Sequence, residues 1–380
     1  MSPSSVVLPH EVHHRDPSGL APEYVRRITR YLPGKPIGEL AREFGLDERD
    51  IVKLASNENP RGPSAAVRAA IAAATDHLCR YPDGNGFELK AALAERFEVS
   101  PEQIVLGNGS NDVLELATQA FLRPGDHAVY SRHAFAVYPL ATQARGGIGI
   151  EVPALDMGND LRAMARAITP TTRIVFVANP NNPTGTWLPP SAMEAFIASV
   201  PEGTLVVLDE AYNEYLEPEQ QAPSAGWVAK YPKLIVSRTF SKAYGLAALR
   251  MGYGIMHPKV ADMLNRVRQP FNVNALAQAA ALAALADAGF VETSRALNRE
   301  GMNALEQGLR AMAVDYVPSH ANFLLIKVGN AGRVYQRLLE QGVIVRPVAN
   351  YGLPEHLRVT IGLPEENRRF LTALESALAA

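Results

Sequence analysis

The sequence predicts an α/β fold in which helices sandwich a mostly parallel sheet, joined to a smaller α+β domain. Two patterns support this prediction. Between residues 104 and 256, short runs rich in valine and isoleucine lack polar alternation, and segments of crossover length separate them. After about residue 270, long helical patterns alternate with a few strands. A chain of 380 residues is long enough for two such bodies.

Six runs are predicted to form strands of the large sheet. In chain order they read "IVLG", "HAVYS", "RIVFVANP", "TLVVLDEAY", "LIVSRTFSK" and "GYGIM". Polar segments lie at the ends of four of them, namely "GNGSND", "NPNNPTG", "DEAY" and "SRTFSK". Ligands of such sheets bind beyond the carboxyl ends of the strands. The sequence therefore predicts a ligand site where these polar segments meet.

The last part of the chain is predicted to be α+β. An alanine-rich helix at 273–289 precedes a charged helix at 294–312, and the strands "NFLLIKV", "VIVRPV" and "LRVTIG" surround a helix through "VYQRLLEQG". We expect a large α/β domain over residues 60–270. We expect a small domain that combines residues 23–59 with residues 271–380.

The N-terminal residues 1–22 hold prolines and serines without hydrophobic periodicity, which predicts a disordered tail. This tail contains His10, His13 and His14, and metal binding is the alternative to a solvated tail. No accompanying carboxylate or cysteine pattern favours a metal, so we predict no metal site.

Composition indicates an ordinary globular protein, with 47% hydrophobic and 20% charged residues. The net charge of −2 argues against nucleic acid or an acidic membrane face as a partner. Asn274, Gln278 and Asp287 interrupt the most apolar helical stretch, so we expect no membrane span. A single cysteine, Cys79, and no signal-peptide pattern lead us to expect a cytoplasmic protein.

The turn "GNGSND" is a candidate phosphate site. Gly109, Ser110 and Asn111 lie where a predicted strand turns into a helix, and free backbone N–H groups at a helix start attract phosphate. Taken alone, ordinary helix capping is the more common explanation of these residues.

Three further polar residues lie at predicted strand ends. Asp209 ends a run expected to be covered on both faces, where a carboxylate needs a cationic or proton-donating partner. Tyr212 follows three residues later, and the rigid turn of "NPNNPTG" carries Asn182. A salt bridge, a cap and plain turn chemistry are the structural alternatives.

Lys242 adds an amine to this group. Burial and the nearby cation Arg250 should lower its pKa, as a Schiff-base lysine requires, whereas a solvated lysine is the alternative. One cofactor needs a phosphate seat, an anion for a ring nitrogen, donors for a ring oxygen and an amine for an aldehyde. That cofactor is pyridoxal 5′-phosphate.

In order and spacing, "NPNNPTG", "LDEAY" and "SRTFSKAYGLAALRMGYG" resemble the fold type I, aspartate-aminotransferase-like family of pyridoxal-phosphate enzymes. The resemblance implies that Lys242 forms the Schiff base and shuttles the proton, while Asp209 pairs with the pyridine nitrogen. It further implies cofactor contacts from Gly109, Ser110, Asn111, Ser241 and Arg250 to the phosphate, from Asn182 and Tyr212 to the ring oxygen, and from Phe135 as a stacked ring. An isolated phenylalanine is more often a core residue.

Within this family, "YLPGKPIGEL", "LASNENPRGPS", "RYPDGNG", "VIVRPV" and "LRVTIG" resemble the histidinol-phosphate aminotransferase subfamily. The resemblance implies a homodimer in which Tyr81 reaches the cofactor phosphate of the neighbouring subunit. It also implies substrate contacts from Tyr31, Asn59, Arg346 and Arg358. Arginine forks suit bidentate recognition of phosphate and carboxylate, although surface ion pairs are the alternative for both arginines.

The implied reaction is transamination of L-histidinol phosphate with 2-oxoglutarate, which yields imidazole acetol phosphate and glutamate. Aromatic amino acid aminotransferases share the motifs, and threonine-phosphate decarboxylases use a similar scaffold for a different reaction. An aminotransferase-like DNA-binding regulator is a non-enzymatic alternative. The short segment before the sheet and the negative net charge disfavour it.

Overall fold

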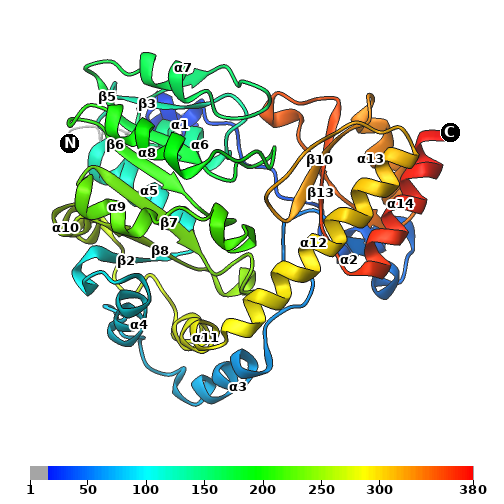
Figure 1. The fold of residues 1–380 in the computed structure, drawn as a ribbon, viewed down its shortest axis with the longest axis horizontal. Coiled ribbons are helices and arrows are strands. Elements are labelled where there is room, and N and C mark those ends of the chain that lie inside the picture. The colour runs from blue at the N-terminus through cyan, green and yellow to red at the C-terminus, as the bar shows by residue number, and fades with distance from the viewer. Residues whose placement is uncertain (1–15, 380) are drawn as a thin grey trace, which may run out of the picture.

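The computed structural model describes residues 16–379. Seven strands form one sheet between layers of helices, as Figure 1 shows. In the order in which they pair, they are β2 (Ile104–Asn108), β8 (Met251–Met256), β7 (Leu234–Thr239), β6 (Leu205–Asp209), β5 (Thr172–Ala178), β3 (His127–Ser131) and β4 (Ile148–Val152). The five strands from β7 to β4 are parallel, whereas β8 is antiparallel to both of its neighbours. The predicted mostly parallel sheet is confirmed.

The helices cover both faces of this sheet or belong to the smaller body. They are α1 (Glu23–Arg26), α2 (Ile37–Phe44), α3 (Ala65–Ala74), α4 (Phe87–Phe97), α5 (Ser110–Phe121), α6 (Val137–Gln143), α7 (Leu161–Arg166), α8 (Pro190–Ser199), α9 (Ser224–Lys230), α10 (Pro258–Val267), α11 (Ala275–Ala286), α12 (Ala288–Ala311), α13 (Ala331–Glu340) and α14 (Pro364–Ala379). One hydrophobic core lies under α3, α4, α8, α9 and α11, and another lies under α5 and α10. Sheet residues face both cores, so the central strands are apolar throughout.

A smaller antiparallel sheet forms the second body, on the right in Figure 1. Its strands pair in the order β12 (Arg346–Pro347), β13 (His356–Thr360), β10 (Phe323–Lys327) and β9 (Tyr316–Val317). Residues of α12, α13 and α14 pack on this sheet in a core of their own. Next to it, β1 (Val52–Lys53) pairs in parallel with β11 (Val343–Ile344), which brings the N-terminal segment into the smaller body.

The alanine-rich helix α11 packs with the large sheet, although it lies in the range that we expected for the small domain. Ala277, Ala280 and Ala281 are fully buried in the core beneath that sheet. Their small side chains let the helix approach its neighbours closely. The body of the large sheet therefore extends beyond residue 270, and α12 makes the connection to the smaller body (Figure 1).

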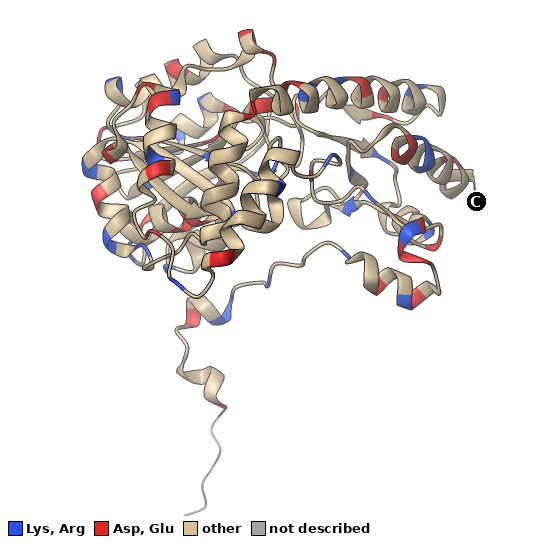
Figure 2. Ribbon diagram, turned by 90° about the horizontal axis from the view of Figure 1, so that it is seen from below, with Lys and Arg blue, Asp and Glu red and all other residues tan. Residues whose placement is uncertain are grey.

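The start of the chain partly departs from the predicted tail. Residues 1–15, with His10, His13 and His14, lie outside the described residues. Residues Pro17–Leu20 form a short 3-10 helix, because the Asp16 side chain caps its start. After α1, an extended segment runs beneath the molecule from the large sheet toward α2, as Figure 2 shows.

The carboxyl ends of the strands lie at one edge of the sheet. β2 and β7 are both antiparallel to β8, so β2 runs in the same direction as the parallel strands. The carboxyl ends of β2, β5, β6 and β7 are therefore neighbours, and the amino end of β8 lies among them. Sequence reasoning missed β4, whose first residue Ile148 is exposed and which pairs only with β3 among the described strands.

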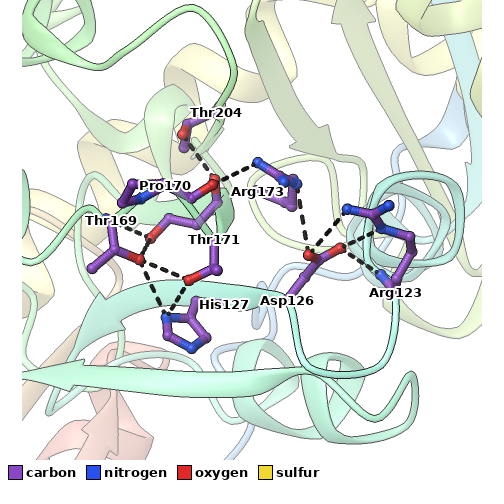
Figure 3. Close-up of polar contacts among 9 residues, drawn as sticks. Arg123, Asp126, His127, Thr169, Pro170, Thr171, Arg173 and Thr204 are labelled. Carbon is purple, nitrogen blue, oxygen red and sulfur yellow. Dashed lines mark hydrogen bonds and ion pairs between the residues drawn. The ribbon is translucent and has the colours of Figure 1, made fainter.

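Polar contacts tie together the opposite edge of the sheet, where β3 and β5 begin (Figure 3). Asp126 lies between two arginines, 3.1 Å from Nε of Arg123 and 3.7 Å from Nε of Arg173. Beside these three residues, the Thr171 hydroxyl lies 3.1 Å from Nδ1 of His127. These local contacts hold the amino ends of the strands together, away from the predicted ligand site.

Charged residues of both signs are interspersed on the surface helices in Figure 2. Arg266 and Asp262 of α10, for example, form an exposed pair 2.9 Å apart. Within residues 16–379 no single helix is long and apolar enough to cross a membrane, and the pair α11–α12, which passes that test together, is bent by 80°.

Inside the large body, Arg238 of β7 is buried between two carboxylates. Its Nη2 lies 2.7 Å from Oε2 of Glu210, and its Nη1 lies 3.9 Å from Oε1 of Glu214. The Ser224 hydroxyl also donates to Glu210 over 2.8 Å. Burial raises the pKa of Glu214, and Arg238 opposes that rise. Arg238 thus neutralises acids that would otherwise be costly to bury.

We expect Arg238→Leu to lower the free energy of unfolding by about 3–5 kcal/mol, because two buried carboxylates lose their cation. Urea unfolding near neutral pH measures the loss. The matched control Arg266→Leu breaks an exposed pair and should cost at most about 1 kcal/mol. Equal losses in the two variants would show that the buried cluster does not stabilise the fold.

Candidate active site

A cavity of about 180 Å³ opens at the carboxyl edge of the large sheet, where the smaller body faces it. Both bodies supply its walls. The predicted site residues that line it are Tyr31, Ser110, Asn111, Phe135, Asn182, Asp209, Tyr212, Ser241, Lys242, Arg250, Arg346 and Arg358. Residues from distant parts of the chain thus meet where the ends of the strands predicted a ligand site.

Asp209 ends β6 and is almost fully buried in the wall of the cavity. Its Oδ2 accepts a hydrogen bond of 2.8 Å from the hydroxyl of Tyr138. Its Oδ1 is buried and has no hydrogen-bond partner among the described residues. Burial raises the pKa of Asp209 to about 6, and the hydrogen bond from Tyr138 opposes that rise. The free oxygen can accept a proton-bearing group of a ligand.

Tyr212 lies near Asp209 at the same edge, and its oxygen already accepts one hydrogen bond. The Asn57 amide donates to it over 2.8 Å. Since a phenol has one proton and that contact does not use it, Tyr212 keeps its hydroxyl proton for another acceptor. Burial raises the pKa of Tyr212 to about 12, so the phenol stays protonated at neutral pH. Tyr212 can therefore donate to a ligand oxygen.

The amine of Lys242 donates to the carbonyl oxygen of Ser56 over 3.0 Å. Burial, together with the positive charge of Arg358, lowers the pKa of Lys242 to about 7. A lysine with this pKa has a large unprotonated fraction at neutral pH. It can therefore act as a nucleophile or a base, as we predicted from its position.

The predicted phosphate turn lies beside Arg250. Gly109 has a φ of +82°, and a side-chain carbon there would lie 2.5 Å from Nη2 of Arg250. The start of α5 at Ser110 is packed closely as well, since a side chain on Gly252 would lie 2.2 Å from the Ser110 nitrogen. The Nη1 of Arg250 lies 3.3 Å from the Ser241 hydroxyl. These groups form a compact, positively charged seat for an anion at a helix start.

Two arginines of the smaller sheet reach the cavity together. Arg346 and Arg358 pair directly across the antiparallel strands β12 and β13, so their side chains leave the sheet on the same face. Arg358 donates to Oδ1 of Asn182 over 2.5 Å and to the carbonyl of Ala55 over 2.9 Å. Its Nε is buried and has no hydrogen-bond partner among the described residues. Arg346 donates to the carbonyl of Leu32 over 2.7 Å.

Asn59 does not line the cavity, although we expected it to do so. Its amide donates to the carbonyl of Ala243 over 2.8 Å and to the hydroxyl of Ser294 over 2.9 Å. These buried contacts hold Asn59 between Ala243, which follows Lys242, and Ser294 of α12. Asn57, two residues earlier, lines the cavity in its place.

Tyr81 lies outside this cavity, as the predicted role toward a neighbouring subunit requires. Its side chain is 83% exposed. Its ring stacks on Phe271, with centroids 4.7 Å apart. Phe271 is itself 45% exposed and has a φ of +56°. The two rings form an aromatic pair that one chain leaves largely uncovered.

Sequence reasoning missed several residues of the site and its surroundings. Asn57 and Tyr351 line the cavity, and Tyr138 binds Asp209 from behind it. Asn57 stands in the quoted "LASNENPRGPS", and Tyr138 lies three residues after Phe135, so both segments were noticed without these residues. An aromatic residue in a helix and an asparagine in a turn have common structural explanations, and their partners lie far away in the sequence.

The fold and this site define a class of protein. Residues 49–374 match the family model for class I and II aminotransferases. The chain belongs to the class I and II aminotransferase family.

Its relatives identify the subfamily that it resembles. Histidinol-phosphate aminotransferase 2 of Ralstonia nicotianae is 60% identical over 362 residues, which cover 94% of this chain and 97% of the relative. Histidinol-phosphate aminotransferase 2 of Nitrosospira multiformis is 58% identical, covering 94% and 92%. These relatives confirm the predicted resemblance.

Solved structures agree with this classification. The histidinol-phosphate aminotransferase of Sinorhizobium meliloti, crystallised with pyridoxal-5′-phosphate, superimposes with a TM-score of 0.87 at 28% identity, covering 94% of this chain and 97% of that one. Aspartate aminotransferase of Thermus thermophilus with maleate gives 0.78 at 28% identity, covering 92% and 100%. The fold type I prediction is therefore confirmed.

The low pKa of Lys242 predicts that its ammonium destabilises the ligand-free fold. Because the pKa is about 7 when folded and near its ordinary 10.5 when unfolded, the unfolded chain binds more protons between these values. The free energy of unfolding should therefore rise with pH across this window. Lys242→Met should stabilise the apoprotein at pH 7 by at least about 1 kcal/mol, and the difference should shrink toward pH 10.5.

Urea unfolding of the apoprotein at several pH values measures this effect. Lys259→Met, at an exposed position on α10, is the matched control and should change the stability at pH 7 by at most about 0.5 kcal/mol. A Lys242→Met protein with wild-type stability at pH 7 would show that the amine is not held in its neutral form.

Proposed function

We propose that the chain is a pyridoxal-phosphate-dependent histidinol-phosphate aminotransferase. It would transfer the amino group of L-histidinol phosphate to 2-oxoglutarate and yield imidazole acetol phosphate and glutamate. One observation carries this proposal. A single cavity joins a lysine of low pKa, a carboxylate with a free buried oxygen and two paired arginines. The names of the relatives support the choice of substrate.

The residues present fit pyridoxal phosphate. The free Oδ1 of Asp209 suits a protonated ring nitrogen, and Tyr212 has a proton available for the ring oxygen. The close approach of Arg250 to Gly109 leaves a seat for phosphate at the start of α5. When bound, the cofactor supplies an aldehyde that reacts with amines and a ring that accepts electrons.

Lys242 has the central role in the proposed mechanism. Its Nζ is nucleophilic near neutral pH because burial and Arg358 lower its pKa. When it is not bonded to the cofactor aldehyde, the same amine would act as a base and take the proton from the substrate carbon that bears the nitrogen. It would later act as an acid and return a proton. Asp209 would stabilise positive charge on the ring nitrogen of the bound cofactor, and Phe135, which lines the same cavity, would be available to pack on the ring.

The paired arginines would bind both substrates. Arg358 and Arg346 lie on one face of the small sheet, and the Nε of Arg358 has no hydrogen-bond partner within residues 16–379. A phosphate in one half-reaction and a carboxylate in the other can use the same guanidinium groups. The guanidinium of Arg346 lies over the ring of Tyr31, with its Cζ 5.5 Å from the ring centroid. Tyr31 thus completes this wall of the cavity.

The comparisons do not favour the alternative activities. The relatives at 58–60% identity are histidinol-phosphate aminotransferases, not aromatic aminotransferases or decarboxylases. Carbon dioxide release from threonine phosphate and turnover of phenylalanine and tyrosine remain direct tests of the alternatives.

We also propose a homodimer, a cytoplasmic location and a two-domain chain. The exposed Tyr81–Phe271 pair supports a subunit contact. The single cysteine, Cys79, is free and exposed, as is usual in a reducing compartment. The separate cores of the two bodies support this division, since Val52 and Leu54 share the core of the small body with residues that follow α11.

Arg358→Leu should lower kcat/KM for histidinol phosphate by about tenfold to a hundredfold. A charge-assisted hydrogen bond to phosphate contributes roughly 1.5–3 kcal/mol, and each 1.36 kcal/mol corresponds to about one decade in rate. Coupled assays with 2-oxoglutarate, comparing histidinol phosphate, phenylalanine and tyrosine as donors, measure the change and rank the substrates.

Histidinol, which lacks the phosphate, is the matched substrate control. It should be a poor substrate of both proteins and change little with Arg358→Leu. If histidinol and histidinol phosphate lost the same factor, Arg358 would support the cavity rather than hold the phosphate. A wild-type preference for phenylalanine would overturn the proposed substrate.

Complementation tests the proposed sharing of Tyr81 between subunits. Lys242→Ala and Tyr81→Ala chains should each be nearly inactive as homodimers. In a heterodimer, both lesions fall in one site if Tyr81 serves the partner, so the other site is intact. Doubly tagged, co-expressed heterodimers should then show about half of the wild-type activity.

An inactive heterodimer would place Tyr81 in the site of its own chain. A fully active monomer in sedimentation, or a Tyr81→Ala homodimer with wild-type turnover, would remove the shared site altogether.

A further inference from the structure

Tyr138 lies on α6 behind the cavity wall and is completely buried. Its ring stacks on Phe176, with centroids 4.7 Å apart and planes within 6° of each other. The ring of Phe135 meets the Tyr138 ring in an edge-to-face contact, with centroids 5.9 Å apart. Two aromatic neighbours therefore fix the plane of the phenol, and its hydroxyl has a defined direction.

That hydroxyl makes the two oxygens of Asp209 different. Oδ2 accepts the phenol proton over 2.8 Å, whereas Oδ1 is buried without a partner among the described residues. An untethered carboxylate can turn about its bond to Cβ and exchange its oxygens. The hydrogen bond from a fixed ring prevents that exchange, so one oxygen stays committed and the other stays free.

The phenol is also a permanent donor. Burial raises the pKa of Tyr138 well above its ordinary value, and the nearby charge of Asp209 raises it further. The proton thus stays on Tyr138 across the whole neutral range. In turn, this hydrogen bond favours the anionic form of Asp209, which burial alone would disfavour.

A purely structural role for Tyr138 would explain only half of this arrangement. A buried carboxylate in a static core is expected to have partners for both oxygens. Here one oxygen is satisfied from behind and the other, in a residue that lines the cavity, is not. The asymmetry indicates that Oδ1 is kept for a ligand.

We propose that Tyr138 is a positioning residue, whose hydrogen bond to Oδ2 of Asp209 holds Oδ1 as the single acceptor for the protonated ring nitrogen of the cofactor. This inference rests on the proposed function, since it assumes that pyridoxal phosphate binds in the cavity. Tyr138 itself does not line the cavity and acts only through Asp209.

Tyr138→Phe tests the proposal because it keeps the stacked ring and removes only the hydroxyl. Two ligands are compared by titration of the apoprotein. One is pyridoxal phosphate, and the other is its 1-deaza analogue, in which a C–H group replaces the ring nitrogen. The wild type should prefer pyridoxal phosphate, and the variant should lose about tenfold to a hundredfold of that preference.

A second measurement reads the proton directly. With cofactor labelled with ¹⁵N in the ring, the NMR shift of the wild-type holoenzyme should be that of a protonated pyridine. In Tyr138→Phe it should move toward the unprotonated value, because Asp209 becomes more basic and takes the proton. The control Tyr215→Phe removes another buried hydroxyl, one that lies 3.4 Å from Asn322, and should leave both readouts unchanged.

Unchanged ligand preference and ¹⁵N shift in Tyr138→Phe would overturn the proposal. If that variant fails to fold, Asp209→Asn is compared with Asp209→Asn/Tyr138→Phe, which removes both partners of the hydrogen bond. The proposal expects no further loss of preference on adding Tyr138→Phe there, and a further tenfold loss would contradict it. A wild type that does not bind pyridoxal phosphate would refute the proposed function instead, so the two failures are distinguishable.

Discussion

This structure depends on one constraint. Its cavity holds charged groups out of water without pairing them to one another, and this burial costs free energy. Asp209, Lys242 and Arg358 all line one cavity, yet no ion pair joins any two of them within residues 16–379. Had they paired, each would be satisfied and chemically inert. Because they are buried without pairing, burial lowers the pKa of the amine and raises that of the carboxylate, which leaves a neutral base beside a free acceptor.

Neutral contacts in and behind the cavity wall maintain this separation. Tyr138 donates to Asp209, Ser56 accepts from Lys242, and Asn182 and Ala55 accept from Arg358. Each contact satisfies part of a charged group without neutralising it. The large body tolerates this arrangement because its own buried charges, around Arg238, are compensated locally. Uncompensated charge is therefore concentrated in the cavity.

Much of the fold and most of the site could be predicted from the sequence, because both follow from short-range patterns. Apolar runs indicated buried strands, and the polar residues after them marked the carboxyl edge where Asp209 and Lys242 meet. The parts that failed depend on long-range packing. Asn57 contacts Tyr212 across 155 residues, and α11 joins the large core because alanines fit there, neither of which any local pattern encodes. Of two motif asparagines two residues apart, sequence reasoning chose Asn59, whereas Asn57 lines the cavity.

Asn57 also explains how two bodies with separate cores can share one site. Its backbone N–H donates to Thr360 of the small sheet, its carbonyl accepts from Asn322, and its side chain reaches Tyr212 of the large body. Its φ of +55° is uncommon for a residue with a side chain, so these contacts hold a backbone that would otherwise relax. Asn57 therefore links Tyr212 of the large body to β13, the strand that carries Arg358. The position of the Tyr212 hydroxyl and that of the paired arginines thus depend on the same contacts between the two bodies.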